Sequence, residues 1–241
     1  MQLSKLEDKV YETLKRNSFE IFRIRDICLL MGISRTKAYN IMKALKKKKA
    51  VESIKKGVFS LRGTNEFAIG TSLSWPSYIS FWTALNYYHF SDNLPRKIFL
   101  ASTKYHKEIR QFKYITLSRK RFFGYVNLNG IVIADKEKAL VDSLLFPKYS
   151  GGISEVISCI KANKKQFDVE KLVNYALRVE SRAVIRRLGF IFEMLGFKNR
   201  RLLKNIGKGY ELLDPTLKKK NNLNKKWLLD INIQNDIIRR A

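Results

Sequence analysis

The stretch Ile24–Leu61, with the sequence IRDICLLMGISRTKAYNIMKALKKKKAVESIKKGVFSL, decides the fold of the amino-terminal part of the chain. An apolar stripe of helical spacing stops at Gly32, a residue that ends helices because it accepts a positive φ at little cost. Ser34 is then well placed to cap a second helix, which carries a stripe of its own. The two stripes consist of Ile24, Ile27, Cys28 and Met31, and of Ala38, Ile41, Met42 and Leu45. This pattern predicts a helix, a tight turn and a second helix.

A basic hairpin follows the second helix. The segments Ala50–Ile54 and Val58–Leu61 are β-prone, and Lys55-Lys56-Gly57 joins them. A basic hairpin directly after a helix-turn-helix is typical of a wing, the loop that lies along the nucleic-acid backbone in winged helices.

Upstream of this stretch, apolar residues three and four positions apart predict a first helix over residues 4–16 with Ser4 as its cap. A short β-prone stretch follows at 19–22. The order is therefore helix, strand, helix, turn, helix and hairpin. We expect a winged helix-turn-helix domain over residues 1–63.

The rest of the chain predicts an α+β domain with a helical end, over residues 73–241. We expect the interval from Gly63 to Ser72 to be a polar, turn-rich connection. Pro76 suits the first position of a helix, whose aromatic face is more typical of a core than of a ligand site. That face consists of Tyr78, Phe81, Trp82, Leu85 and Tyr88. The overall fold class is α+β.

Short strands and then helices follow this segment. The β-prone stretches are 97–102, 114–118, 122–126 and 130–134. Asp135 is placed to cap a helix that carries Ala139, Leu140 and Leu144. From Ile153 the pattern is helical, with breaks at 163–167, Ser181 and Gly196, before a basic and less regular end.

The chain is strongly basic throughout. Its 241 residues carry 48 Lys and Arg against 21 Asp and Glu, a formal charge of +27. Residues 1–63 contribute +10 and the remainder +17, so both parts attract polyanions, either phosphate backbones or anionic lipid. No apolar run approaches the roughly 18 to 20 residues that span a bilayer, and Met1–Val10 lacks the apolar core of a signal peptide. We expect a cytoplasmic protein with no membrane partner.

Metal and cofactor chemistry finds little support in the sequence. Cys28, Cys159, His89 and His106 are the only cysteines and histidines, so a zinc site would need all four to converge. Both cysteines lie in apolar helical contexts that favour core thiols. No phosphate-binding glycine loop, dinucleotide fingerprint or H-E-x-x-H motif occurs. We expect no cofactor, no metal and no enzyme activity.

Three carboxylates lie close together in the segment 135–142. Asp135, Glu137 and Asp142 suggest a metal cluster, but their spacings of two and five place them on different faces of a helix. Lys138 and Asp142, four residues apart, make a better ion pair. The segment therefore predicts a structural helix.

The second helix of the helix-turn-helix carries the candidate DNA-binding residues. Packing uses its apolar stripe, which leaves groove-reading side chains toward solvent. Arginine matches guanine O6 and N7, asparagine matches adenine N6 and N7, and lysines contact phosphates. With the wing, the candidates are Arg35, Thr36, Lys37, Tyr39, Asn40, Lys43, Lys47, Lys55 and Lys56. The alternatives are a merely solvated basic helix, or a winged helix that binds a protein instead of DNA.

Four stretches of this sequence resemble the AbiEi antitoxin family. They are Pro76–Leu85 (PSYISFWTAL), Phe122–Tyr125 (FFGY), Ile133–Asp142 (IADKEKALVD), and Arg187–Phe190 (RLGF) with Glu193. Together with the winged helix, the resemblance covers residues 1 to about 196, and residues 197–241 do not match.

The resemblance implies a function. Members of that family join an amino-terminal winged helix to an α+β domain, repress their own promoter and counter a nucleotidyltransferase-like toxin, with no stable complex between antitoxin and toxin. The implied partners are double-stranded DNA of the chain's own operator and that toxin, and paired half-sites would suit a homodimer on DNA. The alternative is a winged-helix regulator whose second domain senses a small molecule or RNA, or is an enzyme.

Overall fold

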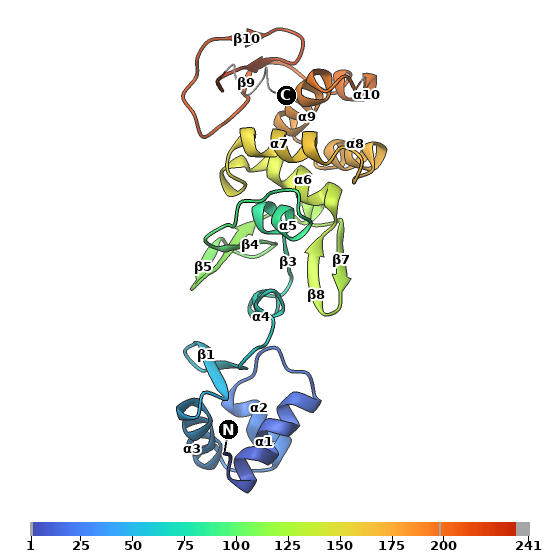
Figure 1. Cartoon of the computed structure of the whole chain (residues 1–241). Coiled ribbons are helices and arrows are strands. Elements are labelled where there is room, and N and C mark those ends of the chain that lie inside the picture. Colours follow the sequence, from blue (N-terminus) through green and yellow to red (C-terminus); the bar gives the residue numbers. More distant parts are fainter. Residues whose placement is uncertain (1, 198, 235–241) are drawn as a thin grey trace.

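The amino-terminal part of the computed structural model is a three-helix unit with a β-hairpin, and the structure describes residues 2–197 and 199–234. Its elements are α1 (Lys5–Arg16), α2 (Ile24–Met31), α3 (Arg35–Lys47), β1 (Val51–Lys55) and β2 (Val58–Leu61). Figure 1 shows this unit at one end of the molecule, with the mixed sheet in the middle and helices beyond it. The predicted winged-helix order is confirmed.

Local capping explains where these helices begin and end. The Ser4 hydroxyl accepts from the Glu7 amide and the Glu7 carboxylate accepts from the Ser4 amide, a reciprocal capping box. Gly32 ends α2 with φ +60°, and the Ser34 hydroxyl accepts from the Lys37 amide to begin α3. The expected helix-turn-helix boundaries are therefore confirmed.

The predicted strand at residues 19–22 is reduced to one bridge. Phe22 pairs antiparallel with Phe59 through hydrogen bonds of 2.8 and 2.9 Å, and their rings stack. This bridge ties the segment before α2 to the second strand of the wing. Val10, Leu14 and Ile27 then pack against the buried face of α3.

The interval expected to be a turn-rich connection is instead helix α4 (Glu66–Leu73), capped by the Asn65 side chain. Gly70 lies where a Cβ would come within 2.9 Å of Phe112, and its carbonyl accepts from the Tyr114 hydroxyl at 2.6 Å. The small residues that suggest a turn, such as Gly70, instead allow this helix to pack closely on Phe112. The prediction of turns in this interval is wrong because tertiary contacts stabilise a helix of low local propensity.

The prediction of a helix that begins at Pro76 is also wrong over its first half. Ser77–Ile79 forms strand β3, fully buried, and helix α5 (Phe81–Tyr87) begins only at Phe81. β3 pairs antiparallel with β4 and parallel with β8, so ladder hydrogen bonds override the helical spacing of the aromatic residues. Tyr78, Phe81 and Leu85 are nevertheless core residues, as predicted, and Trp82 is half-buried.

The middle of the molecule is a six-stranded mixed sheet in the order β5-β6-β4-β3-β8-β7. The further strands are β4 (Ile98–Ser102), β5 (Lys107–Ile109), β6 (Phe112–Thr116), β7 (Tyr125–Leu128) and β8 (Ile131–Ala134). β4 runs parallel to β6, while β5–β6 and β7–β8 are antiparallel hairpins. The strand predicted over 122–126 corresponds to β7, which begins three residues later, at Tyr125. α4 packs on β3, β4 and β8 on the side toward the winged helix.

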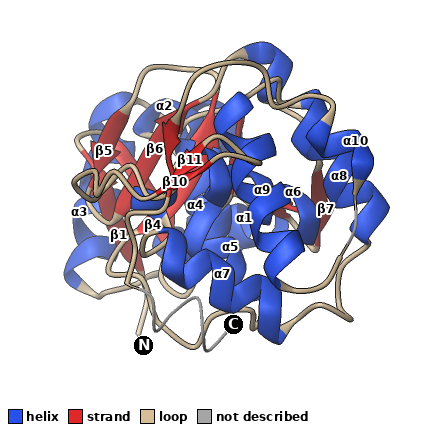
Figure 2. Cartoon of the chain, turned by 90° about the horizontal axis from the view of Figure 1, so that it is seen from above, coloured by secondary structure: helices blue, strands red, loops and turns tan. Residues whose placement is uncertain are grey.

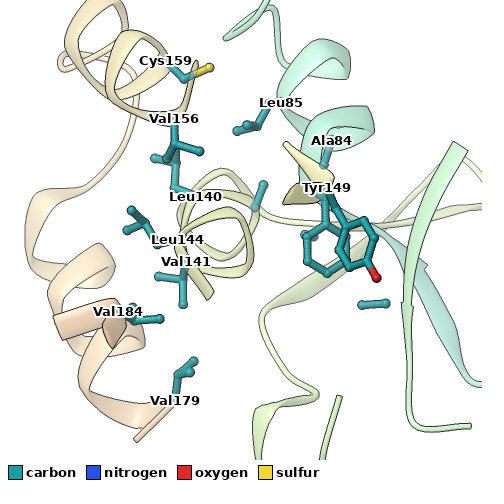
Figure 3. Close-up of a cluster of buried hydrophobic side chains, with 14 of the residues drawn as sticks. Ala84, Leu85, Leu140, Val141, Leu144, Tyr149, Val156, Cys159, Val179 and Val184 are labelled. Atoms are coloured by element: carbon teal, nitrogen blue, oxygen red, sulfur yellow. The ribbon is translucent and has the colours of Figure 1, made fainter. Parts of the chain in front are cut away.

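Helices cover the side of the sheet away from the winged helix. They are α6 (Lys136–Leu145), α7 (Ile153–Ala162), α8 (Val169–Arg178), α9 (Arg182–Met194) and α10 (Arg200–Leu203), with 3-10 turns at Arg119–Arg121 and Pro147–Tyr149. α6 is central, in contact with α5, α7, α8 and α9. Figure 3 shows its side chains Leu140, Val141 and Leu144 gathered with Val156 and Cys159 of α7 and Val184 of α9. The predicted breaks between these helices are confirmed.

A small three-stranded sheet completes the chain. It consists of β9 (Glu211–Leu212), β10 (Leu223–Asn224) and β11 (Leu229–Asp230). Trp227 anchors it on α9, where a Cβ at Gly189 would lie 2.0 Å from the indole ring and where the indole N–H donates to Glu193. The carboxyl-terminal end of the expected second domain, residues 235–241, lies outside the described residues.

A buried polar cluster joins β3 to α6. Asp142 accepts from the Tyr78 hydroxyl at 3.0 Å and the Ser80 hydroxyl at 2.8 Å, and it pairs with Lys138. Both partners of that ion pair are fully buried, and the Lys138 ammonium also lies over the Phe123 ring. The predicted ion pair is confirmed, and it holds a helix onto a strand.

Candidate nucleic-acid interface

The solvent face of α3 carries the side chains that the sequence singled out. Arg35, Thr36, Lys37, Tyr39, Asn40, Lys43 and Lys47 are all exposed. The opposite face, Ala38, Ile41, Met42 and Leu45, is buried in the winged-helix core. Burial of that stripe fixes the rotation of the helix, so the polar residues face solvent. Tyr39, at 60% exposure, contributes an aromatic ring to this surface.

The wing is anchored from both sides. Next to its turn, Ile54 and Val58 are buried and belong to the core of the larger domain, while Phe59 stacks on Phe22. Gly57 takes φ +75° at the turn, and Lys55 and Lys56 are exposed there. The hairpin is thus held close to its turn, and its two lysines remain in solvent.

The predicted cations carry uncompensated charge. Within the part of the chain that the structure describes, no carboxylate oxygen lies within 4.0 Å of a charged nitrogen of these six residues. The six are Arg35, Lys37, Lys43, Lys47, Lys55 and Lys56. Unpaired cations on one face produce a positive potential that attracts phosphates.

A hollow of about 420 Å³ lies between α2, the start of α3 and the wing. Arg23, Arg25 and Arg35 line it together with Cys28 and Gly57. Arg35 and the wing turn, predicted as separate parts of the interface, therefore border the same hollow. Lys43 and Lys47 lie two to three turns farther along α3, away from it.

Sequence reasoning missed Arg23 and Arg25. Both are exposed, and they flank the start of α2, outside the helix that the motif marks as groove-reading. Their role depends on the approach of α2 to the wing, a tertiary feature. The available signal was the pair of arginines at the start of the first helix of the helix-turn-helix, because that helix crosses the DNA backbone in this motif.

The carboxylates of α6 each have a structural partner. Asp135 caps the helix by accepting from the Lys138 amide at 2.8 Å. Glu137 accepts from the Asp168 amide at 2.8 Å and lies 2.9 Å from the Lys171 ammonium. Among residues 2–197 and 199–234, no group of three Cys, His, Asp or Glu side chains is arranged to hold a metal ion. No helix in those same ranges is long and apolar enough to cross a bilayer.

Comparison with known proteins bears on the fold. No protein-family model and no curated protein sequence matches the chain. Among solved structures, the RV2827C protein from Mycobacterium tuberculosis is similar, with a TM-score of 0.70 at 10% sequence identity. The match covers 99% of this chain and 95% of that one. The chain therefore shares with that protein one α+β fold, in which amino-terminal helices with a hairpin precede a mixed sheet and a helical segment.

Proposed function

We propose that this chain is a DNA-binding transcriptional regulator that represses its own promoter. The observation that carries the proposal is the solvent face of α3, where unpaired cations and an asparagine lie beside an arginine-lined hollow and a basic wing. In a winged helix such a face enters the major groove, while the wing lies along the backbone.

The residues divide into base-reading and backbone-binding groups. Arg35 lies at the start of α3, where side chains usually reach base edges, and its guanidinium suits guanine O6 and N7. Asn40 suits adenine N6 and N7. Lys43, Lys55 and the two arginines at the start of α2 supply phosphate contacts, which position the protein without selecting a sequence.

We further propose that the larger domain acts as an antitoxin toward a nucleotidyltransferase-like toxin, without forming a stable complex with it and without an enzymatic role. The support is the resemblance of Pro76–Leu85 and Ile133–Asp142 to the AbiEi family. In the fold these stretches form β3, α5 and α6. A nucleotidyltransferase gene beside this one, and rescue of growth when both are expressed, would support this part of the proposal. Continued growth arrest with soluble full-length protein would contradict it.

Sequence readout tests the DNA proposal. Fluorescence anisotropy compares binding to the chain's own upstream region with binding to a shuffled duplex of equal length. Arg35→Ala and Asn40→Ala should each cost about 1 to 3 kcal/mol on the upstream region and less on the shuffled duplex. Lys55→Ala should weaken both duplexes equally, and Lys219→Ala, exposed in the carboxyl-terminal segment, is the control. If Arg35→Ala, Asn40→Ala and Lys55→Ala each lost the same affinity on both duplexes, base reading by α3 would be contradicted.

A further inference from the structure

A hollow with aromatic walls lies between the winged helix and the β7 edge of the larger domain. Its volume is about 360 Å³, in the range of pockets that hold small molecules. Glu20, in the segment between α1 and α2, lines it from the winged helix, and its other lining residues come from α4, the start of β3 and the β7–β8 hairpin. Figures 1 and 2 place β7 on the other side of the molecule from α3. This aromatic pocket is therefore separate from the face proposed to bind DNA.

Three aromatic side chains, Trp75, Phe122 and Tyr125, line the pocket. The rings of Phe122 and Tyr125 pack on each other, with centroids 5.2 Å apart. Both also pack on the ring of Tyr78, whose hydroxyl is held by the Asp142 carboxylate at 3.0 Å. Trp75 is 75% exposed, which leaves a large indole surface free for a ligand. Aromatic side chains arranged in this way stack on planar heterocycles such as nucleobases.

Glu20 and Asn127 give the pocket an acceptor and a donor. In the described ranges no charged nitrogen lies within 4.0 Å of the half-buried Glu20 carboxylate, and no group donates a hydrogen bond to it. The Asn127 Oδ1 atom accepts from the Gly130 amide at 2.9 Å, so its Nδ2 group is the end left to donate. Hydroxyl groups can rotate to suit a ligand, whereas these two groups cannot exchange roles. The carboxylate and the amide therefore decide which ligand fits.

The charge of the lining disfavours two classes of ligand. Among the described residues that line the pocket, none is a lysine or an arginine, so a phosphate or carboxylate would meet no cation there. An organic cation would pair with Glu20, but it offers no acceptor to Asn127, and the formal charge of +27 opposes its approach. The ligand that suits the pocket is neutral and planar, with donors for the carboxylate and an acceptor for the amide.

We infer that the aromatic pocket binds the guanine base of a free nucleoside. The Watson–Crick edge of guanine carries two adjacent donors, N1–H and the 2-amino group, beside the O6 acceptor. The two donors suit the Glu20 carboxylate and O6 suits the Asn127 amide. Adenine has an acceptor at N1, and uracil has an acceptor on each side of N3–H, so either base would place an acceptor against the carboxylate. Binding at this pocket does not require DNA.

Isothermal titration calorimetry on the full chain compares guanosine with inosine, adenosine, 5′-GMP and the organic cation agmatine. Glu20→Gln and Asn127→Asp change the two polar groups, and Trp75→Leu removes the indole. Asn127→Asp keeps an oxygen for the Gly130 amide. Tyr105→Leu is the matched control, because Tyr105 is 91% exposed between β4 and β5, away from the β7 edge of the sheet. Circular dichroism verifies that each variant is folded.

Guanosine should bind the unmodified chain, and 5′-GMP should bind no more tightly. Inosine, which lacks the 2-amino group, should bind at least about tenfold more weakly, because one hydrogen bond to the carboxylate is lost. Trp75→Leu should weaken guanosine binding by at least about fivefold, and Tyr105→Leu should leave it unchanged. Asn127→Asp should weaken it because a carboxylate then faces O6. Glu20→Gln should weaken guanosine and largely remove the preference over inosine, since an amide offers a single acceptor oxygen.

Failure of guanosine to bind the unmodified chain would overturn the inference and leave the proposed DNA-binding function standing. Binding of agmatine or 5′-GMP without binding of guanosine would overturn it too, because a cation or a phosphate would then be the recognised group. Equal affinities for guanosine and inosine would show that Glu20 does not read the base. Unchanged guanosine affinity in folded Trp75→Leu and Glu20→Gln would place the nucleoside outside this pocket.

Discussion

The two cysteines lie in different surroundings, and their reactivity should report on the fold and on DNA. Cys159 is buried on α7, and burial raises its pKa from 9.0 to about 12. Cys28 is half-buried and lines the arginine hollow. Since the thiolate is the reactive form, N-ethylmaleimide at pH 8 should modify Cys28 and spare Cys159 in the native protein. Because the folded pKa of Cys159 exceeds the unfolded one, its stabilising contribution should be lost as pH rises above 9 toward 12.

Saturating DNA should protect Cys28 from the same reagent if the hollow faces the duplex. Peptide mapping by mass spectrometry, with and without the upstream duplex, measures both sites in one experiment. Modification of Cys159 at the rate of Cys28 would contradict the described core. Equal Cys28 labelling with and without bound DNA would place the duplex elsewhere.

Arg187 is a buried cation, and among residues 2–197 and 199–234 no carboxylate oxygen lies within 4.0 Å of its guanidinium nitrogens. Its guanidinium donates to the carbonyls of Leu144 at 2.7 Å, Leu213 at 2.9 Å and Leu212 at 3.1 Å, and burial lowers its pKa to about 10. It thereby fastens α6 and the β9 segment to α9. Arg187→Leu should lower the free energy of unfolding by about 3 to 5 kcal/mol, because three buried carbonyls lose their donors. Urea unfolding measures this, and a loss below about 1 kcal/mol would show that water replaces the guanidinium.

Helix caps and helix ends are predicted reliably from this sequence, because they depend only on nearby residues. The caps at Ser4, Ser34 and Asp135 and the helix end at Gly32 were predictable, because each depends on neighbours within four positions. The meeting of Arg23 with Arg35 was not predictable. Arg23 precedes α2 and Arg35 begins α3, and no sequence spacing encodes the approach that lets both line one hollow.

At the scale of elements, the buried Lys138–Asp142 pair holds α6 against β3. Asp142→Leu leaves the Lys138 charge buried without a counter-charge and should cost about 3 to 5 kcal/mol of stability. Combining it with Lys138→Met removes both charges, so the double variant should be less destabilised than the sum of the single ones. A double-mutant cycle in urea gives the coupling energy. Simple additivity would mean that the two side chains do not interact as described.

Two elements show where sequence reasoning fails. The residues of α4 resemble a turn, yet Tyr114 and Phe112 pack directly on Gly70 and stabilise a helix. The aromatic residues of β3 and α5 share a helical spacing, yet pairing with β4 and β8 makes the first part a strand. In both cases contacts distant in sequence outweigh a weak local preference.

At the scale of the whole molecule, the two parts are more closely joined than a flexible connection would allow. Ile54 and Val58 of the wing and Ile69 of α4 belong to the core of the larger domain. A fragment over 64–241 loses Ile54 and Val58 but keeps Ile69 and the rest of α4, so it should still fold and relieve toxin-dependent growth arrest without binding the upstream region tightly. A fragment over 73–241 lacks α4, uncovers Phe112, and should be much less stable. Thermal unfolding and growth rescue compare the two, and equal stability would contradict the role given to α4.

The salt dependence of DNA binding by the full chain tests the α3 and wing interface most directly. The formal charge of +27 and the unpaired cations on α3 predict that phosphate contacts dominate the affinity for DNA. If six to ten phosphates are neutralised, raising salt from about 50 to 200 mM should weaken binding to the upstream region by roughly a thousandfold or more. Affinity that stays constant over that range, or no binding at about 50 mM salt, would contradict a DNA-binding function for this surface.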